Sequence, residues 1–362
     1  MLIFKEEQIR RLFKAIARKF NMSEEEEAAW VDHSIQVELR GNLMQGIAYL
    51  DHHYIQRFSD GRVIFGTKFT KIKETPSMVV LDAGGAPGAL AGTKAMELAV
   101  GKAKKSGACV VSVRHSNDWG MIAYYSMQAL KHDCIGLVMV NSRPEVAPCG
   151  GTEAIFGLDP FSVAIPAEKH FPIVVDMSSS DTRGLKAQEE LILGETIPEG
   201  LYYDDKGQIV ADPSKWGSYL KGWGIEGGAM RMSGYRDLCL SVIMEALGGA
   251  LSGMSCAKDL GTPEPAVDGL RTPRGQFCMA IDIDQFTPIE EFKRKIDRMI
   301  DQAKSSRLAE GFTEILMPGE KEFKEVEKRR KEGIPVHEKV WEKVKQSVKG
   351  LGIDVEKVIK AE

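Results

Sequence analysis

The sequence has little that would assign it to a membrane, secreted or metal-binding class. No apolar run approaches the roughly 18 residues that are needed to span a bilayer. The first residues lack a basic segment followed by an apolar one, so no secretory signal is indicated and we expect a cytoplasmic location. The 6 cysteines are scattered without a C-x-x-C pair, which favours buried thiols over a zinc site or a disulfide framework.

Several common catalytic and nucleotide-binding motifs are also missing. The chain has no H-E-x-x-H pair, no G-x-S-x-G nucleophile elbow and no Walker A loop, so we expect no bound metal. The glycine-rich run at 84–88 does not spell G-x-G-x-x-G, and no acidic residue follows it in a Rossmann context. We therefore interpret these glycines as turn residues and reject a Rossmann site here.

The composition that remains is that of an ordinary globular protein. The 362 residues are 43% hydrophobic and 28% charged, which is enough to bury a large core in one elaborate domain or two lobes. A formal net charge of -4 gives no reason to expect nucleic acid or an anionic membrane as a partner.

Strands and helices alternate along the chain, which predicts an α/β fold. Apolar residues at helical spacing predict a helix over 6–20, and Ser23 with Glu26 forms a capping box that begins a second helix. Residues 77–113 have the order strand, turn, helix, strand. Further helices are predicted at 123–130, 240–251, 322–332 and 341–348, and another helix begins at a capping box at 287–290. Further strands are predicted at 134–141, 161–165, 172–175 and 277–283.

The stretch at 148–180, PCGGTEAIFGLDPFSVAIPAEKHFPIVVDMSSS, is the predicted functional centre. Its two short apolar segments are bounded by prolines, which is typical of buried strands. The second ends at Asp176, and the three hydroxyls of 178–180 follow. A carboxylate and hydroxyls just past a buried strand are well placed to bind a ligand. A serine-rich turn without a ligand explains the same residues equally well.

This stretch resembles the malate/L-lactate dehydrogenase family of the sulfolactate dehydrogenase type, and the resemblance extends from roughly Phe4 to Ile353. That family is unrelated to the Rossmann malate and lactate dehydrogenases. The resemblance implies a mixed sheet with a non-Rossmann nicotinamide site, helical elements at both ends of the chain, and a homodimer. It divides the chain into a helical, dimerising lobe at 1–75 and 285–362 and an α/β region at 76–284 that holds cofactor and substrate.

The chain departs from the family where substrate chemistry is expected. The family motif RG-x-x-SHG reads RGNLMQG at 40–46, so Gln45 stands where the presumed proton-donating histidine lies. An amide exchanges protons too slowly near neutral pH, but it can hold a carbonyl oxygen by hydrogen bonding. A basic residue that often grips the substrate carboxylate is matched by Tyr49.

A second family histidine is matched by Asp118, in the segment HSNDWG. This carboxylate either caps the following turn or acts as a general base if desolvation raises its pKa, and we predict that it carries the proton. His115 either contacts substrate or makes local hydrogen bonds in a loop. Leu158 and Asp159 replace a Thr-Asn pair of the family. Asp176 matches an aspartate that is thought to pair with the family's catalytic histidine.

The remaining matches fall on the expected cofactor site. The family's GYKGYGL becomes GYRDLCL at 234–240, where Arg236 keeps the charge of the family's lysine but not its shape. The family's LPGE becomes MPGE at 317–320. The resemblance thereby implies cofactor contacts from Asp176, Ser178, Ser179, Arg236, Pro318, Gly319 and Glu320.

Together these residues predict hydride transfer between NAD or NADP and a small 2-keto or 2-hydroxy acid, or a related carbonyl or imine, in an altered active site. The predicted catalytic residues are Asp118, Gln45 and Asp176, and the predicted substrate contacts are Tyr49, His115 and Asp159. The alternative is a family scaffold that has lost hydride transfer and serves as a binding or regulatory protein. Retention of the cofactor positions favours the enzyme.

Overall fold

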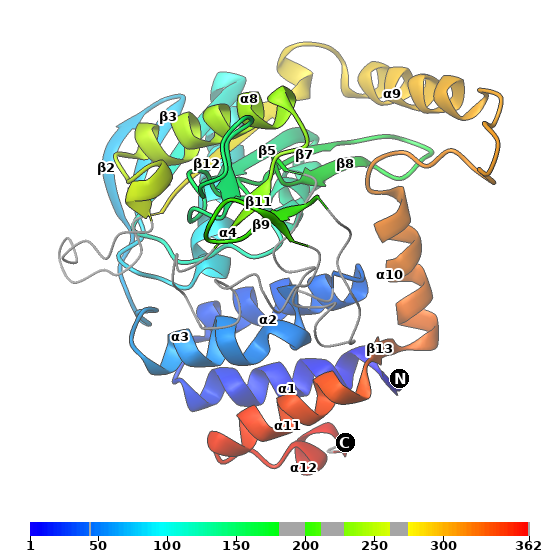
Figure 1. Ribbon diagram of the computed structural model, residues 1–362. Helices are drawn as coiled ribbons and strands as arrows, with labels where there is room; N and C mark the ends of the chain where they lie inside the picture. Colours follow the sequence, from blue (N-terminus) through cyan, green and yellow to red (C-terminus); the bar gives the residue numbers. More distant parts are fainter. Residues whose placement is uncertain (43–44, 181–199, 211–227, 261–273, 361–362) are drawn as a thin grey trace.

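The computed structural model describes residues 1–42, 45–180, 200–210, 228–260 and 274–360. These residues form a helical part built from both ends of the chain, a seven-stranded sheet with its covering helices, and a small four-stranded sheet (Figure 1). No helix in these ranges is long and apolar enough to cross a membrane.

The large sheet is mixed, as predicted. Its order is β2 (Thr70–Thr75), β3 (Met78–Asp82), β4 (Ala108–Arg114), β12 (Gly275–Asp282), β5 (Cys134–Val140), β7 (Phe161–Ile165) and β8 (Ile173–Met177). Only β3 and β4 are parallel among these neighbours, and α4 (Gly88–Ser106) makes the crossover between them. This topology differs from the doubly wound parallel sheet of a Rossmann domain.

The glycine-rich run before α4 is a turn, which confirms its interpretation. Gly84 and Gly85 have φ angles of 57° and 81°, values that favour glycine because it has no Cβ. Gly88 lies so close to the loop after β4 that a Cβ would be 1.8 Å from the carbonyl oxygen of Asp118. The turn therefore places the loop that carries Asp118.

The helical part joins the two ends of the chain. It comprises β1 (Leu2–Phe4), α1 (Glu6–Lys19), α2 (Glu24–Leu39), α10 (Glu320–Glu332), β13 (Ile334–Val336), α11 (Glu338–Gly350) and α12 (Val355–Lys360). Strands β1 and β13 pair antiparallel, and Phe4, Phe13, Trp30 and Trp341 belong to one apolar cluster drawn from both ends. The predicted capping box of Ser23 at the start of α2 is confirmed.

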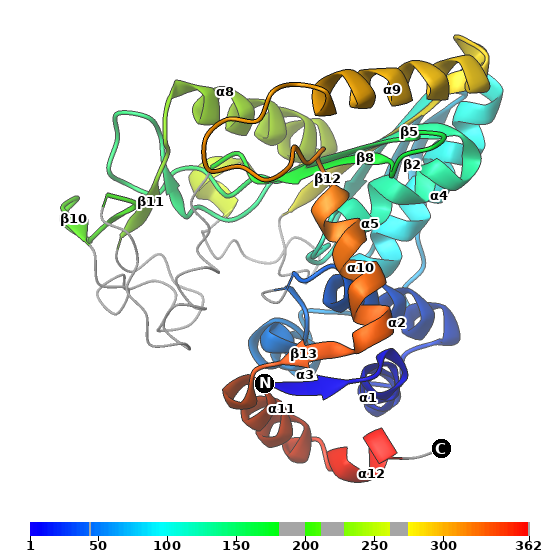
Figure 2. The same ribbon diagram turned by 90° about the vertical axis from the view of Figure 1, so that its right-hand side faces the viewer.

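The boundaries of the two predicted lobes stay a prediction. Strand β2 pairs with β3 in the large sheet, and α9 (Ile289–Lys304) lies over the sheet, away from α1 and α11 (Figures 1 and 2). The Asp297 carboxylate of α9 accepts hydrogen bonds from the backbone N–H groups of Glu168, Lys169 and His170, in the turn between β7 and β8. Both elements are thus attached to the α/β part.

Three local predictions need correction. The capping box at 287–290 is not formed, because Pro288 takes the N-cap position and no side chain caps the helix there. The helix predicted at 240–251 begins earlier, as α8 (Tyr235–Met244), and continues as a π-helical segment, Glu245–Gly249, and a 3-10 turn, Ala250–Ser252. The helix predicted at 123–130 is α5 (Ala123–Ser126) followed by a 3-10 segment, Met127–His132.

The small sheet lies beside the end of the large one, in the order β10 (Ile209–Val210), β9 (Tyr202–Tyr203), β11 (Ala229–Arg231) and β6 (Val146–Ala147). Strand β6 follows β5 closely in the chain, so the small sheet continues the segment that leaves the centre of the large sheet. That segment carries part of the candidate site.

Candidate active site

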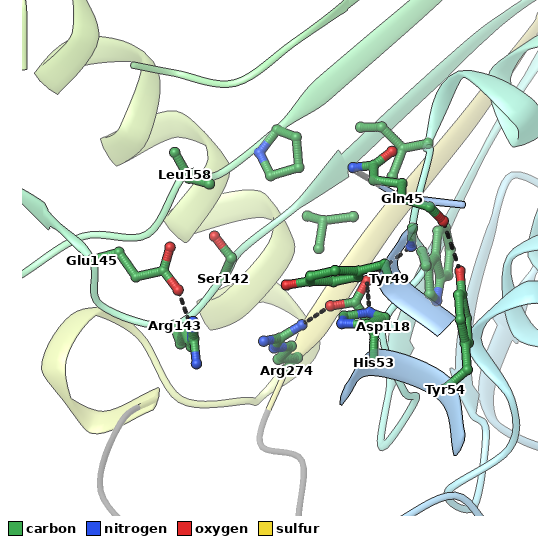
Figure 3. Close-up of a pocket in the computed structure, with 15 residues that line it drawn as sticks. Gln45, Tyr49, His53, Tyr54, Asp118, Ser142, Arg143, Glu145, Leu158 and Arg274 are labelled. Atoms are coloured by element: carbon green, nitrogen blue, oxygen red, sulfur yellow. Dashed lines mark hydrogen bonds and ion pairs between the residues drawn. The ribbon is translucent and has the colours of Figure 1, made fainter. Parts of the chain in front are cut away.

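A cavity of about 120 Å³ lies between one edge of the large sheet and the helical part (Figure 3). Its sheet side consists of segments that follow β4 and β5 or precede β7 and β12, and all of these strand ends meet at the same edge. The lining residues on this side are Asp118, Trp119, Gly120, Ile122, Val140, Ser142, Arg143, Glu145, Leu158, Pro160 and Arg274.

The helical wall of the cavity comes from the segment after α2. Gln45, Tyr49, His53 and Tyr54 line it, carried by a 3-10 turn, Ile47–Tyr49, and a π-helical segment, Leu50–Ile55. The ring of Tyr49 stacks on His53 with 4.5 Å between centroids (Figure 3). π-Helical turns are rare and occur frequently at functional sites, so this irregular segment marks the wall as functional.

A buried carboxyl group holds the start of that wall. Glu38 is fully buried at the end of α2, and its carboxyl oxygen accepts a hydrogen bond from the Ile47 backbone N–H. Gly46 packs against it so closely that a Cβ would be 1.9 Å from Oε1 of Glu38. Burial raises the pKa of Glu38 to about 7. The positions of Gln45 and Tyr49 therefore depend on Glu38 and on a glycine at 46.

Asp118 is the centre of an ion-pair network in the cavity. Its Oδ2 atom pairs with Nη1 of Arg274 and lies 3.8 Å from Nη1 of Arg57, and its Oδ1 atom lies 3.4 Å from Nε2 of His53. Oδ1 also accepts a hydrogen bond of 2.9 Å from the backbone N–H of Gly120, which closes the local turn.

Asp118 was predicted to act as a general base if desolvation raises its pKa. The ion-pair network prevents that rise. Desolvation acts to raise its pKa. His53, which is charged at the low pH where Asp118 titrates, together with Arg274 and Arg57, outweighs desolvation and holds the pKa well below its usual range. Asp118 is therefore ionised at neutral pH, and its role in proton transfer stays a prediction.

His53 lines the cavity beside Asp118, and the sequence reasoning did not single it out. Burial, and then the charge of Arg57, lower its pKa to about 4, so the imidazole is neutral near pH 7. A neutral imidazole can accept a hydrogen bond or a proton, and at this pKa it is a weak base. The sequence does hold one sign that His53 lies beside Tyr49. The two residues are four apart in a helical stretch, and residues at that spacing share a face.

A second ion pair, Arg143 with Glu145, lines the cavity in the segment after β5. The preceding residue, Ser142, is held by Asp159, whose Oδ1 atom accepts hydrogen bonds from its backbone N–H and its hydroxyl at 2.9 and 3.2 Å. Desolvation and the nearby Glu245 raise the pKa of Asp159 well above its usual range. Asp159, predicted to contact substrate, instead lies fully buried behind the wall and supports it.

His115 also lies away from the lining residues. Its Nδ1 atom is 2.9 Å from Oδ2 of Asp82, and its φ angle is 52°. It directly follows β4 and contacts the end of the neighbouring strand β3, so it lies outside the cavity, and its contact with a substrate stays a prediction.

The candidate cofactor residues cluster at the end of β8 and on α8. The backbone N–H of Ser179 donates to the carbonyl oxygen of Leu158 at 2.9 Å, and its hydroxyl accepts from Ser241 at 2.8 Å. Ser179 thereby joins β8, the cavity wall and α8. Asp176, at the end of β8, and Arg236, in the first turn of α8, are exposed, and Ser178 is half-buried.

The MPGE segment attaches α10 to β8. The carbonyl oxygen of Pro318 accepts from the backbone N–H of Val174 at 3.0 Å, and Gly319, with a φ of 84°, leaves no room for a Cβ against Val174. Burial opposes ionisation of Glu320, yet Lys304, the Met317 backbone N–H and Lys324 lower its pKa to about 2. These contacts are structural, and cofactor binding by the segment stays a prediction.

Fold and site together define a mixed α/β protein with a cavity that is lined by two ion pairs. Residues 4–345 match the family described as malate/L-lactate dehydrogenase. The chain is 34% identical to malate dehydrogenase of Pyrococcus abyssi, over 94% of each chain, and 33% identical to L-sulfolactate dehydrogenase of Methanocaldococcus jannaschii, over 99% of this chain and 100% of that one. The crystal structure of malate dehydrogenase from Entamoeba histolytica superposes with a TM-score of 0.90 at 26% identity, covering 98% and 99% of the two chains.

The chain belongs to the malate/L-lactate dehydrogenase family. The resemblance drawn from the sequence is therefore confirmed, together with its mixed α/β fold and its helical elements at both ends.

Proposed function

We propose that this protein transfers a hydride between NAD or NADP and a small 2-hydroxy or 2-keto acid, or a related carbonyl or imine. The observation that carries the proposal is the position of His53, whose imidazole lines the cavity 3.4 Å from the carboxylate of Asp118. Dehydrogenation of an alcohol needs a proton acceptor at this kind of position. The dehydrogenase names of the relatives agree with it.

In the oxidative direction, a 2-hydroxy acid and oxidised cofactor give a 2-keto acid, reduced cofactor and one proton. When bound, the nicotinamide would supply the hydride acceptor. The imidazole of His53 takes the hydroxyl proton, and Asp118, 3.4 Å from its Nε2 atom, stabilises the imidazolium that results. Gln45 holds the substrate oxygen by hydrogen bonding from the opposite part of the wall. The reductive direction runs through the same groups in reverse.

The chemistry of the β8 and α8 groups fits a dinucleotide. The hydroxyl of Ser178 and the carboxylate of Asp176 suit the ribose hydroxyls, and the exposed guanidinium of Arg236 suits a phosphate. Ser179 ties this group to Leu158 in the cavity wall. We propose Pro318, Gly319 and Glu320 as further contacts because they are attached to the same strand.

We also propose a homodimer in the cytoplasm. The outer side of α8 and the following turn exposes Tyr235, Val242 and Leu251 at 71%, 51% and 54%. Apolar groups gathered in this way suit an interface with a second copy. All six cysteines lie in described residues and are free thiols, as is usual in a reducing compartment.

The test is a fluorescence titration of the purified protein with NADH and, separately, with NADPH. Saturable binding of either cofactor supports the proposal and sets the cofactor preference, and turnover of 2-keto acids or cyclic imines then completes it. Failure of both cofactors to bind contradicts it and favours a scaffold that has become a binding or regulatory protein.

A further inference from the structure

The charges around the cavity are already arranged in pairs. Arg274 is paired with Asp118, and Arg143 with Glu145, and all four side chains line the cavity (Figure 3). Their exposed fractions are low, at 12% and 25% for the first pair and 22% and 7% for the second. The cavity thus presents two cations and two anions whose side chains are largely buried.

Three of these charges act on one point in the cavity. The Tyr49 phenol stacks on His53 and lies in the field of Arg143, Glu145 and Asp118, as well as that of Arg57. Burial raises the pKa of Tyr49. The charges of Glu145 and Asp118 raise this pKa further, and those of Arg143 and Arg57 act in the opposite direction. A ligand that occupies the space beside Tyr49 therefore meets carboxylates as well as guanidinium groups.

One substrate carboxylate can be accommodated here. A guanidinium group has five N–H donors in a fork, so Arg143 or Arg274 can bind a carboxylate of the substrate while it keeps part of its contact with its own partner. A second anionic group on the substrate has no such place among the described lining residues. It meets Glu145 or Asp118, and like charges in a low-dielectric cavity repel strongly.

We propose that the cavity selects a 2-keto or 2-hydroxy acid with a single negative charge, whose far end carries a neutral or cationic hydrogen-bond donor for Glu145. The inference rests on the proposed function and narrows its substrate class. Malate and sulfolactate are dianions at neutral pH. A preference for a single negative charge would therefore separate this chain from the relatives that are named for those two compounds. Glu145 is thereby a specificity-determining residue.

The sharpest test compares two substrates that differ only in the group at their far end. Oxaloacetate is a dianion, and 2-oxosuccinamate carries an amide in place of its distal carboxylate. We expect kcat/KM for 2-oxosuccinamate to be at least tenfold higher, with whichever of NADH or NADPH binds. Glu145→Gln removes the repelling anion and releases Arg143, so it should shift the ratio of the two kcat/KM values at least tenfold toward oxaloacetate.

Glu153→Gln is the matched control. Glu153 is 77% exposed at its side chain and pairs with Lys258 away from the cavity, so its replacement should leave the ratio unchanged. A wild-type preference for oxaloacetate, or a ratio that is the same in Glu145→Gln, overturns the inference. Cofactor binding without turnover of either compound also overturns it and leaves the cofactor site standing. Absence of cofactor binding overturns the proposed function itself.

Discussion

Nε2 of His53 lies 3.4 Å from Oδ1 of Asp118, although the two residues come from different parts of the fold. His53 is on the π-helical segment after α2, and Asp118 is in the loop after β4. The contact joins the helical part to the sheet across the cavity. In the proposed reaction, the imidazole takes the proton and the carboxylate stays charged.

Replacement of His53 by Gln should lower kcat for oxidation by roughly 10²- to 10⁴-fold, because the proton acceptor is lost while the shape is largely kept. With a pKa of about 4 the wild-type imidazole is neutral at both pH 6 and pH 9, so the reduction should be the same at the two pH values. Steady-state kinetics with the best 2-hydroxy acid measure both quantities.

His170→Gln is the control for this variant, since His170 pairs with Asp301 outside the cavity and its replacement should leave kcat unchanged. A markedly smaller effect of His53→Gln at pH 6 than at pH 9 would indicate an imidazole with the ordinary pKa of about 6.5.

Replacement of Asp118 by Asn should reduce both turnover and stability. The carboxylate is the shared partner of Arg274 and Arg57, and removal of one member of a buried charge network leaves the others uncompensated. We expect a loss of about 3 kcal/mol in the free energy of unfolding and a lower kcat. Urea unfolding and kinetics on the same preparation test this, and unchanged stability together with unchanged kcat would contradict it.

Replacement of Glu38 by Gln should change the pH dependence of stability. The pKa of Glu38 is about 7 in the folded protein, against a value of 4.5 for the free group. Between pH 4.5 and pH 7 the folded state therefore keeps the Glu38 proton while the unfolded state loses it. The contribution of this proton to the free energy of unfolding is fully present below pH 4.5 and is lost as the pH rises through 7. At about 1.4 kcal/mol for each pKa unit, ionisation at pH 8 costs about 3 kcal/mol.

Glu38→Gln removes this cost, so its free energy of unfolding should exceed that of the wild type at pH 8 and approach it at pH 5. Denaturant titrations at the two pH values measure the difference. An equal loss of stability at both would show that the carboxyl group acts only by packing.

Replacement of Gly46 by Ala should lower activity more than stability. The added methyl group would lie 1.9 Å from Oε1 of Glu38, so the segment that carries Gln45 and Tyr49 has to move. We expect kcat/KM to fall at least tenfold, with a matched change in KM if Gln45 holds the substrate oxygen. Gly61→Ala is the comparison, since its added Cβ meets no atom within 4 Å; its φ of 77° still costs some stability. Equal kinetics of the two variants would contradict this account.

Much of the architecture was predictable from local patterns. The strands at 134–141 and 161–165 correspond to β5 and β7 almost residue for residue, because their apolar runs are bounded by turn residues. The strand-turn-helix-strand order at 77–113 is confirmed for the same reason. The capping box at 287–290 failed because Pro288 itself takes the N-cap position, one residue later than the pattern implied.

The site was less accessible from the sequence, because its chemistry arises between distant segments. Gln45, Tyr49 and Asp118 do share one cavity. The pKa of Asp118, however, is set by burial and then by charges from distant segments, His53 and Arg274, and Arg274 is 156 residues away in the chain. The direction of that pKa shift cannot be read from the residues around position 118. Likewise, the burial of Asp159 depends on packing against the segment of Ser142 and on Glu245.

The pairing of β1 with β13 has a consequence for the order in which the molecule can be made. The ribosome releases the first strand long before its partner at 334–336 exists, so α1 and α2 must wait for most of the chain with part of their apolar surface uncovered. The large sheet can form earlier, because all of its strands lie before residue 283. The cavity wall that carries His53 rests on the late-completed part, so the site is assembled last, only after the C-terminal helices have emerged.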